Sequence, residues 1–101
     1  MGANETDRCF ALMERFSDLH LDTTMAMTRA SIPYTRIDPV VATNAQLIRW
    51  QYRVVYGSDY PNLPYAYQEE RRDLLERQLS EDVVRKIFRE NALRLYGLER
   101  F

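Results

Sequence analysis

The chain is short of the residues that most metal and redox sites use. Among its 101 residues there is one cysteine, Cys9, and one histidine, His20. A single cysteine excludes an intrachain disulfide and a cysteine-rich zinc site, and it fits a reducing compartment, so we expect a cytoplasmic protein. A single histidine cannot supply the several ligands that a histidine-based metal site needs.

Long apolar runs and an excess of charge of either sign are also missing. No stretch is long enough to span a bilayer, and no signal-peptide pattern is visible. The formal net charge is −1, and acids alternate with bases at residues 69–73, which predicts a solvated helix face. These features argue against nucleic acid and membranes as partners. The 46% hydrophobic content suits one small globular domain.

Hydrophobic periodicity predicts the order helix, strand, helix, strand, helix, helix. We expect helices at residues 6–16, 40–50, 67–78 and 81–96, strands at 19–24 and 52–56, and loops at 25–39 and 61–65. Thr6 or Asn4 is the expected cap of the first helix, Ser80 caps the last one, and Gly97 ends it in left-handed geometry. The apolar residues expected to face the core include Cys9, Phe10, Met13, Phe16, Leu74 and Leu75.

The alternation of helices and strands predicts an α/β protein with parallel strands and crossover helices. Two strands do not make a self-sufficient parallel sheet. Both would leave open apolar edges, which lead to aggregation or to pairing with another chain. We therefore expect the chain to be one part of a larger structure, with self-association or a complementing chain at these strand edges.

Asp59 is the residue best placed for chemistry. It follows the carboxyl end of the second strand, where α/β enzymes place functional groups. Gly57 allows a sharp backbone turn there, and Ser58 can help to orient the carboxylate. Such an aspartate can bind a divalent metal or accept a proton from a metal-bound water, or it can simply cap its own loop. Tyr60 and Asn62 can line a substrate pocket over the strand end or pack under the loop.

Other polar residues fit structural roles better. His20 is expected inside the first strand, as a satisfied histidine rather than a ligand. Thr23 and Thr24 end that strand, and capping is favoured over substrate binding. Asn91 falls on the apolar stripe of the last helix, so its amide must find buried partners, and we expect bonds to the backbone of a neighbouring loop.

Three motifs close the chain: Tyr56-Gly57-Ser58-Asp59-Tyr60-Pro61, Leu79-Ser80-Glu81-Asp82 and Asn91-Ala92-Leu93-Arg94-Leu95-Tyr96-Gly97-Leu98. In this order and spacing, the chain resembles the C-terminal end of amidohydrolase-related, metal-dependent (β/α)8 TIM-barrel proteins. The branch it resembles is that of aminocarboxymuconate-semialdehyde decarboxylase. The resemblance implies one partial barrel domain over residues 1–101, from about helix six to helix eight, incomplete on its own.

The resemblance also implies a chemistry. In that family the aspartate after strand eight binds or adjoins a catalytic divalent metal, often zinc, so Asp59 would be both metal ligand and catalytic residue. The family's other ligands are a His-x-His pair on strand one and histidines on strands five and six, and none is present here. The implied activity is hydrolysis of a C–N or C–O bond in a small molecule by metal-activated water, or nonoxidative decarboxylation by a lyase.

Because most of the ligand set is missing, the isolated chain is expected to be inactive. Two alternatives stay open. One is a noncatalytic barrel remnant that self-associates or docks on a partner. The other is one half of a split enzyme that regains activity with a complementing chain.

Overall fold

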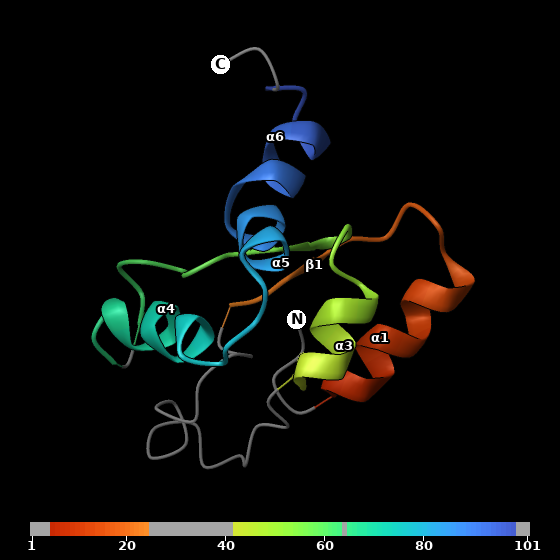
Figure 1. The fold of residues 1–101 in the computed structure, drawn as a ribbon. Helices are drawn as coiled ribbons and strands as arrows, with labels where there is room; N and C mark the ends of the chain where they lie inside the picture. Colours follow the sequence, from red (N-terminus) through yellow and green to blue (C-terminus); the bar gives the residue numbers. More distant parts are fainter. Residues whose placement is uncertain (1–4, 25–41, 64, 99–101) are drawn as a thin grey trace.

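The computed structural model describes residues 5–24, 42–63 and 65–98, so the loop expected at 25–39 lies outside the described residues (Figure 1). Among the described residues, helices and strands follow one another in the order predicted from the sequence. In chain order the elements are α1 (Thr6–Arg15), β1 (Leu21–Asp22), α3 (Asn44–Arg49), β2 (Val54–Val55), α4 (Gln68–Leu75), α5 (Glu81–Arg85), the π turn η1 (Lys86–Glu90) and α6 (Asn91–Leu95).

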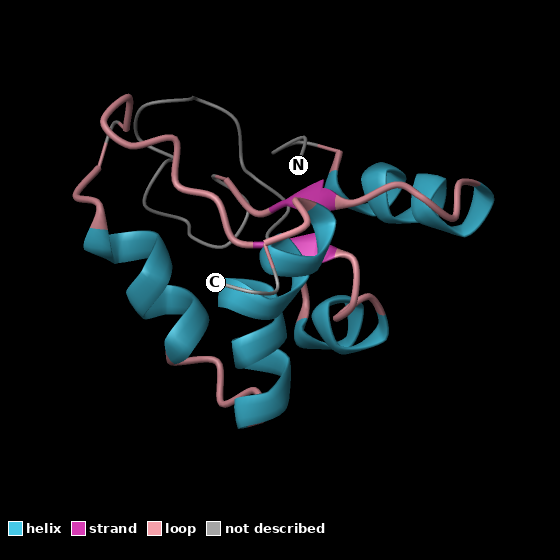
Figure 2. Cartoon of the chain, turned by 90° about the horizontal axis from the view of Figure 1, so that it is seen from above, coloured by secondary structure: helices cyan, strands magenta, loops and turns pink. Residues whose placement is uncertain are grey.

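The two strands lie side by side and run parallel, as predicted (Figure 2). Leu21 is opposite Val54, and Asp22 is opposite Val55. This small parallel sheet with helices around it is an α/β arrangement. Both strands are shorter than predicted. The second starts later because the chain leaves α3 through a turn, in which the Arg53 amide donates to the carbonyl of Trp50 over 2.8 Å.

The first strand also begins later than predicted. His20 precedes β1, and its Nδ1 lies 3.0 Å from the carbonyl oxygen of Asp18. The expectation that His20 lies inside the strand is therefore wrong. The ring is held by the turn that leads into β1.

The starts of the first two helices differ from expectation. Glu5 is the N-cap of α1 and makes no side-chain capping bond, so a Thr6 cap is wrong, while Asn4 lies outside the described residues. Thr6 instead lies fully inside the structure, with an exposed fraction of 0%. The start of α3 is fixed by a capping box: Thr43 Oγ1 accepts from the Gln46 amide over 3.1 Å, and Gln46 Oε1 accepts from the Thr43 amide over 2.9 Å.

The ends of the last helical segment are as predicted. Ser80 Oγ accepts from the amide of Val83 over 3.3 Å, which caps α5. At the other end Gly97 has a φ of 69°. The amide of Leu98 donates to the carbonyl of Leu93 over 2.7 Å, the bond of a Schellman motif.

One core joins the helices to the sheet. It contains the buried apolar residues Phe10, Met13, Leu21, Ala42, Leu47, Val54, Leu74, Val83 and Ile87. The expected burial of Phe16 and Leu75 is wrong, since their exposed fractions are 55% and 47%. Phe16 is the C-cap of α1 and Leu75 is the last residue of α4, so both lie at helix ends.

The last helical segment covers the second edge of β2. The Tyr56 amide donates to the carbonyl of Ile87 in η1 over 2.8 Å. Asn91 Nδ2 donates to the carbonyl of Val54 over 2.8 Å. A π turn contains one residue more than an α turn, which disturbs the regular i→i+4 hydrogen bonding of the helix. A carbonyl in the turn can then accept a hydrogen bond from a neighbouring segment. The expectation that β2 keeps an open edge is thus corrected: at Val54 and Tyr56 the edge is bonded within the chain.

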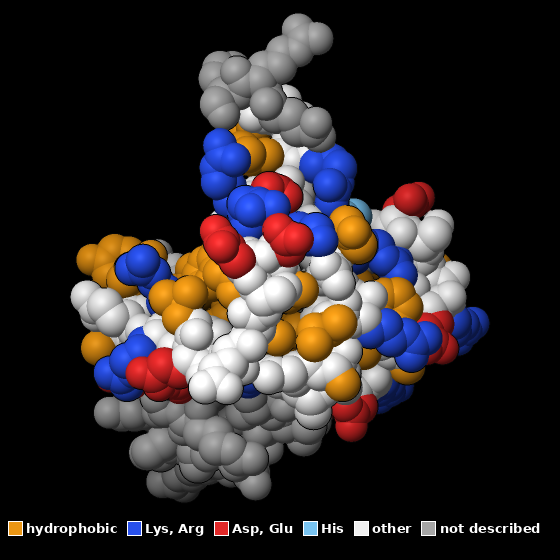
Figure 3. Space-filling view, viewed as in Figure 1, with side chains coloured by type: hydrophobic (Ala, Val, Ile, Leu, Met, Phe, Trp, Pro, Cys, Tyr) orange, Lys and Arg blue, Asp and Glu red, His pale blue; other side chains and the backbone are white. Residues whose placement is uncertain are grey.

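Charges of both signs are interspersed on the face shown in Figure 3. Arg85, for example, pairs with both Asp82 and Glu90 at 2.7 and 2.6 Å. Such solvent-exposed pairs are screened by water and contribute little to stability. Within the described part of the chain, no helix is long and apolar enough to cross a membrane.

Candidate functional site

The loop after β2 presents Asp59 on the surface. Asp59 is exposed and has a φ of 58°, a left-handed backbone that is uncommon outside glycine. Its carbonyl accepts from the Asn62 amide over 2.8 Å, which closes a turn around the cis peptide bond between Tyr60 and Pro61. The Ser58 hydroxyl accepts from the Tyr60 amide over 3.2 Å. The carboxylate therefore sits on a turn with defined internal bonds.

Gly57 connects this turn to the end of β1. Thr23 Oγ1 lies 3.2 Å from the Gly57 nitrogen, where it accepts, and 3.5 Å from the Gly57 oxygen. A Cβ added to Gly57 would lie 2.0 Å from one carboxylate oxygen of Asp22. A side chain at Gly57 would therefore force the Asp22 carboxylate to move, whereas the left-handed backbone of the turn falls on Asp59. The sequence interpretation assigned the sharp turn to Gly57 and did not anticipate the contact with Asp22.

Thr23 and Thr24 both bond groups at the strand ends. Thr23 is fully buried and binds the Gly57 backbone. Thr24 donates from its amide to Asp22 Oδ1 over 2.7 Å, and its hydroxyl donates to the same oxygen. The Thr23 contacts join the end of β1 to the loop that carries Asp59, whereas the Thr24 bonds stay within the end of β1.

A hollow of about 600 Å³ lies beside the loop and is lined by Ser58, Tyr60, Tyr67 and Gln68. The Tyr60 and Tyr67 rings meet edge to face, with centroids 5.3 Å apart. Tyr60, one of the two expected substrate-binding residues, therefore lines this hollow. Neither Asn62, the other one, nor Asp59 is among the described residues that line it.

Glu70 is a buried acid that the sequence interpretation missed. It was placed on a solvated helix face, yet its exposed fraction is 1%. Tyr65 donates its hydroxyl to Glu70 Oε2 over 2.8 Å. Burial, followed by this hydrogen bond, raises the pKa of Tyr65 well above its usual range. The available signal was spacing: Glu70 lies four residues before the buried Leu74, so both fall on one helix face.

Tyr56 adds a second phenol to this region. Its hydroxyl is buried and has no hydrogen-bond partner within the described residues. Burial raises the pKa of Tyr56, and the charge of Glu70 contributes in the same direction. The ring packs on Phe88, with centroids 4.7 Å apart, so it also belongs to the contact between β2 and the last helix.

Asn91 lies away from the turn that carries Asp59, beside the start of β2. It has an exposed fraction of 1%. Its Nδ2 donates to the carbonyls of Gln51 and Val54 over 2.6 and 2.8 Å, and its Oδ1 accepts from Arg94 over 2.9 Å. The amide thereby joins the last helix to the backbone on both sides of the turn that enters β2.

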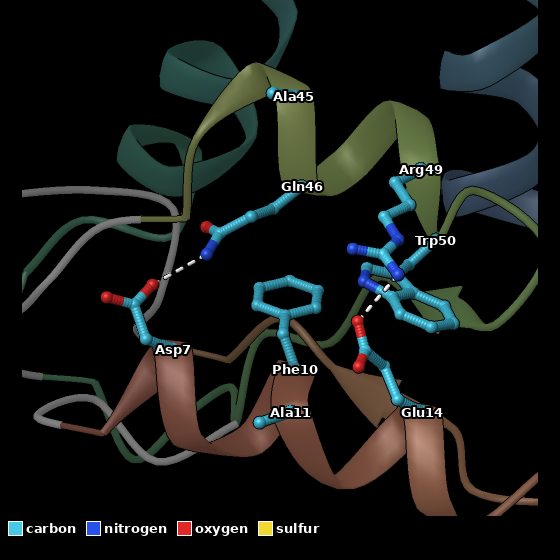
Figure 4. A pocket seen from close by; sticks show the side chains of 8 residues that line it. All are labelled: Asp7, Phe10, Ala11, Glu14, Ala45, Gln46, Arg49 and Trp50. Atoms are coloured by element: carbon cyan, nitrogen blue, oxygen red, sulfur yellow. Dashed lines mark hydrogen bonds and ion pairs between the residues drawn. The ribbon is translucent and has the colours of Figure 1, made fainter.

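A separate cavity of about 330 Å³ lies between α1 and α3 around Phe10 (Figure 4). Gln46 donates to Asp7 over 2.6 Å, and Arg49 pairs with Glu14 at 2.6 Å. These polar side chains bridge the two helices and bind one another. They hold the helices together without indicating a ligand.

These observations define an α/β protein with an exposed aspartate in the loop that follows a parallel strand. The amidohydrolase family model matches residues 3–98, and the chain belongs to this family of hydrolase-like proteins. No curated protein and no solved structure matches the chain.

The family generally uses divalent metals. Within residues 5–24, 42–63 and 65–98, no group of three or more His, Cys, Asp or Glu side chains is placed to hold a metal ion. Cys9 is half-buried on α1, and His20 lies in the turn before β1. The described residues alone therefore do not fit a complete metal centre.

Proposed function

We propose that this chain is the C-terminal part of a (β/α)8 amidohydrolase barrel and contributes Asp59 to a divalent-metal site, with zinc as the expected metal. The remaining ligands would come from histidines outside this chain. The observation that carries the proposal is the position of Asp59, held on a closed turn two residues beyond Gly57 at the carboxyl end of β2. That end of a parallel strand is where barrel enzymes place functional groups.

The proposed reaction class is hydrolysis of a C–N or C–O bond in a small molecule, with nonoxidative decarboxylation as the alternative within the same family. Tyr60 lines the hollow beside Asp59 and is the proposed substrate contact from this chain, together with Asn62 on the same turn. With a single cysteine in the sequence, a cytoplasmic location is part of the proposal.

Complementation tests the proposal. The chain is mixed with a second chain that supplies the histidine-bearing strands, and zinc content and turnover are measured on amide, lactone and unsaturated acid substrates. We expect stoichiometric zinc and turnover only in the mixture, and a loss of turnover of about 100-fold or more with Asp59→Asn. Asp18→Asn, an exposed aspartate before β1, is the matched control and should leave turnover unchanged. Equal turnover with Asp59→Asn would refute the role of this carboxylate.

A second candidate is a noncatalytic remnant that associates with itself or with a partner. The lack of a group of three metal ligands in the described part of the chain favours it. Sedimentation of the isolated chain distinguishes the two. A stable oligomer, together with no turnover on complementation, would support the remnant, whereas turnover in the mixture would exclude it.

A further inference from the structure

We propose that Asp22 is a positioning residue: its carboxylate seats the Gly57 backbone against the end of β1 and thereby fixes the left-handed backbone at Asp59. The importance of the Asp59 carboxylate rests on the proposed function. The conformation of its backbone is a property of this chain and can be measured without metal or substrate.

The register of the sheet brings the two residues together. Asp22 is opposite Val55, and Gly57 lies two residues beyond Val55. Because side chains alternate along a strand, a residue two positions on returns to the same face. The Asp22 side chain therefore reaches over Gly57, and both carboxylate oxygens and their carbon lie within 2.4 Å of the point where a Gly57 Cβ would be.

The carboxylate is itself held in place. Oδ1 accepts from the amide of Thr24 over 2.7 Å and also from the Thr24 hydroxyl. Thr23, the residue after β1, accepts from the Gly57 amide over 3.2 Å. Gly57 is thus fixed by contact with Asp22 and by hydrogen bonds to Thr23, so the direction of the chain into the turn is set two residues before Asp59.

This arrangement explains why a non-glycine residue adopts positive φ at Asp59. A left-handed backbone persists when surrounding contacts determine it. Here the entry to the turn is fixed at Gly57, and its exit is fixed by the bond from the Asn62 amide to the Asp59 carbonyl. Without the contact between Asp22 and Gly57, the turn is held only by the Thr23 hydrogen bonds and by the bond from the Asn62 amide to the Asp59 carbonyl.

Nuclear magnetic resonance of the full isotope-labelled chain tests the inference. At positive φ the amide proton and Hα of one residue lie close together, so Asp59 should give a strong intraresidue cross-peak. We expect Asp22→Ala to weaken this cross-peak and to raise the amide exchange rate of Asn62 by about tenfold or more. Asp22→Asn keeps the shape and an acceptor for Thr24, so both signals should be rescued to within about twofold of the parent chain.

Gln78 is an internal reference, because it also has a positive φ, 59°, and lies outside this loop. Its cross-peak should stay unchanged in all variants. Asp22→Ser, a milder change that keeps an acceptor but empties the space over Gly57, should act in the same direction as Asp22→Ala. An unchanged Asp59 cross-peak in both of these variants, or damage by Asp22→Asn equal to that by Asp22→Ala, would overturn the inference. If the Asp59 cross-peak responds to the Asp22 variants as expected but the complementation experiment gives no turnover, only the proposed function is contradicted.

Discussion

Truncation of Asn91 is the sharpest test of how the last helix is attached to the sheet. Asn91→Ala removes a side chain with an exposed fraction of 1% that donates to two backbone carbonyls. The Val54 carbonyl lies in the buried part of the structure, so water cannot readily replace the lost donor. The Gln51 carbonyl is only partly buried, so its loss should cost less.

The expected loss of stability follows from these two environments. A buried polar group left without its partner costs about 1–3 kcal/mol, and a typical hydrogen bond contributes about 0.5–1.5 kcal/mol. We therefore expect Asn91→Ala to lower the free energy of unfolding by about 2–4 kcal/mol. This is a large part of the roughly 5–15 kcal/mol that a domain of this size has in total.

Denaturant unfolding followed by circular dichroism measures this change. Arg89→Ala, an exposed position two residues earlier, is the matched control and should stay within about 0.5 kcal/mol of the parent chain. Asn91→Asp keeps the volume but cannot donate, so it should cost at least as much as Asn91→Ala at neutral pH. A loss below about 1 kcal/mol for both variants would refute the reasoning, because the donors would then contribute no more than an ordinary exposed bond.

Three further predictions concern other parts of the chain. Gly57→Ala places a methyl group on the Asp22 carboxylate and should lower unfolding free energy by about 1–3 kcal/mol, with much of the loss recovered by adding Asp22→Gly; additive losses would contradict the contact. Ser80→Ala should cost about 1 kcal/mol through the lost α5 cap, and a change near zero in thermal unfolding would contradict this. The pKa of Tyr65 is raised in the folded state, so its phenol stabilises the fold fully below pH 10, the pKa of a tyrosine in the unfolded chain. This stabilisation is lost as the pH rises above 10. Tyr65→Phe should weaken that alkaline decline in denaturant titrations, and an identical decline would exclude this phenol as its source.

Local sequence signals predicted the order of elements well but not the limits of the strands. Ser80 and Gly97 mark helix ends through side-chain and backbone chemistry that is local in sequence, so both were found correctly. The strands were predicted from apolar runs, yet a strand exists only where a partner pairs with it. Val54 and Val55 are opposite Leu21 and Asp22, whereas Arg53 belongs to the turn that leaves α3 and only its carbonyl bonds β1, by accepting from the Leu21 amide.

The parts of the candidate site that depend only on neighbouring residues in the sequence could be predicted. The position of Asp59 after a strand could be inferred from the chain itself. The contact of Asp22 with Gly57 joins residues on different strands, and it depends on a register that sequence spacing does not reveal. Glu70 was missed because a charged residue in an alternating charge run is normally exposed, and that run does not reveal the hydrogen bond from Tyr65.

The proposed completion of the site competes with the chain's own last helix. In a closed barrel the eighth strand lies next to the first, and the family resemblance places the missing His-x-His pair on that first strand. β2 takes the eighth place in the proposal, yet its second edge already makes the Tyr56–Ile87 and Asn91–Val54 bonds. A strand from a second chain must displace both of these hydrogen bonds before it can form its own backbone hydrogen bonds with β2. Asn91→Ala should therefore lower stability but ease complementation, and a parallel loss of both would show that Asn91 supports the site instead of competing for the edge.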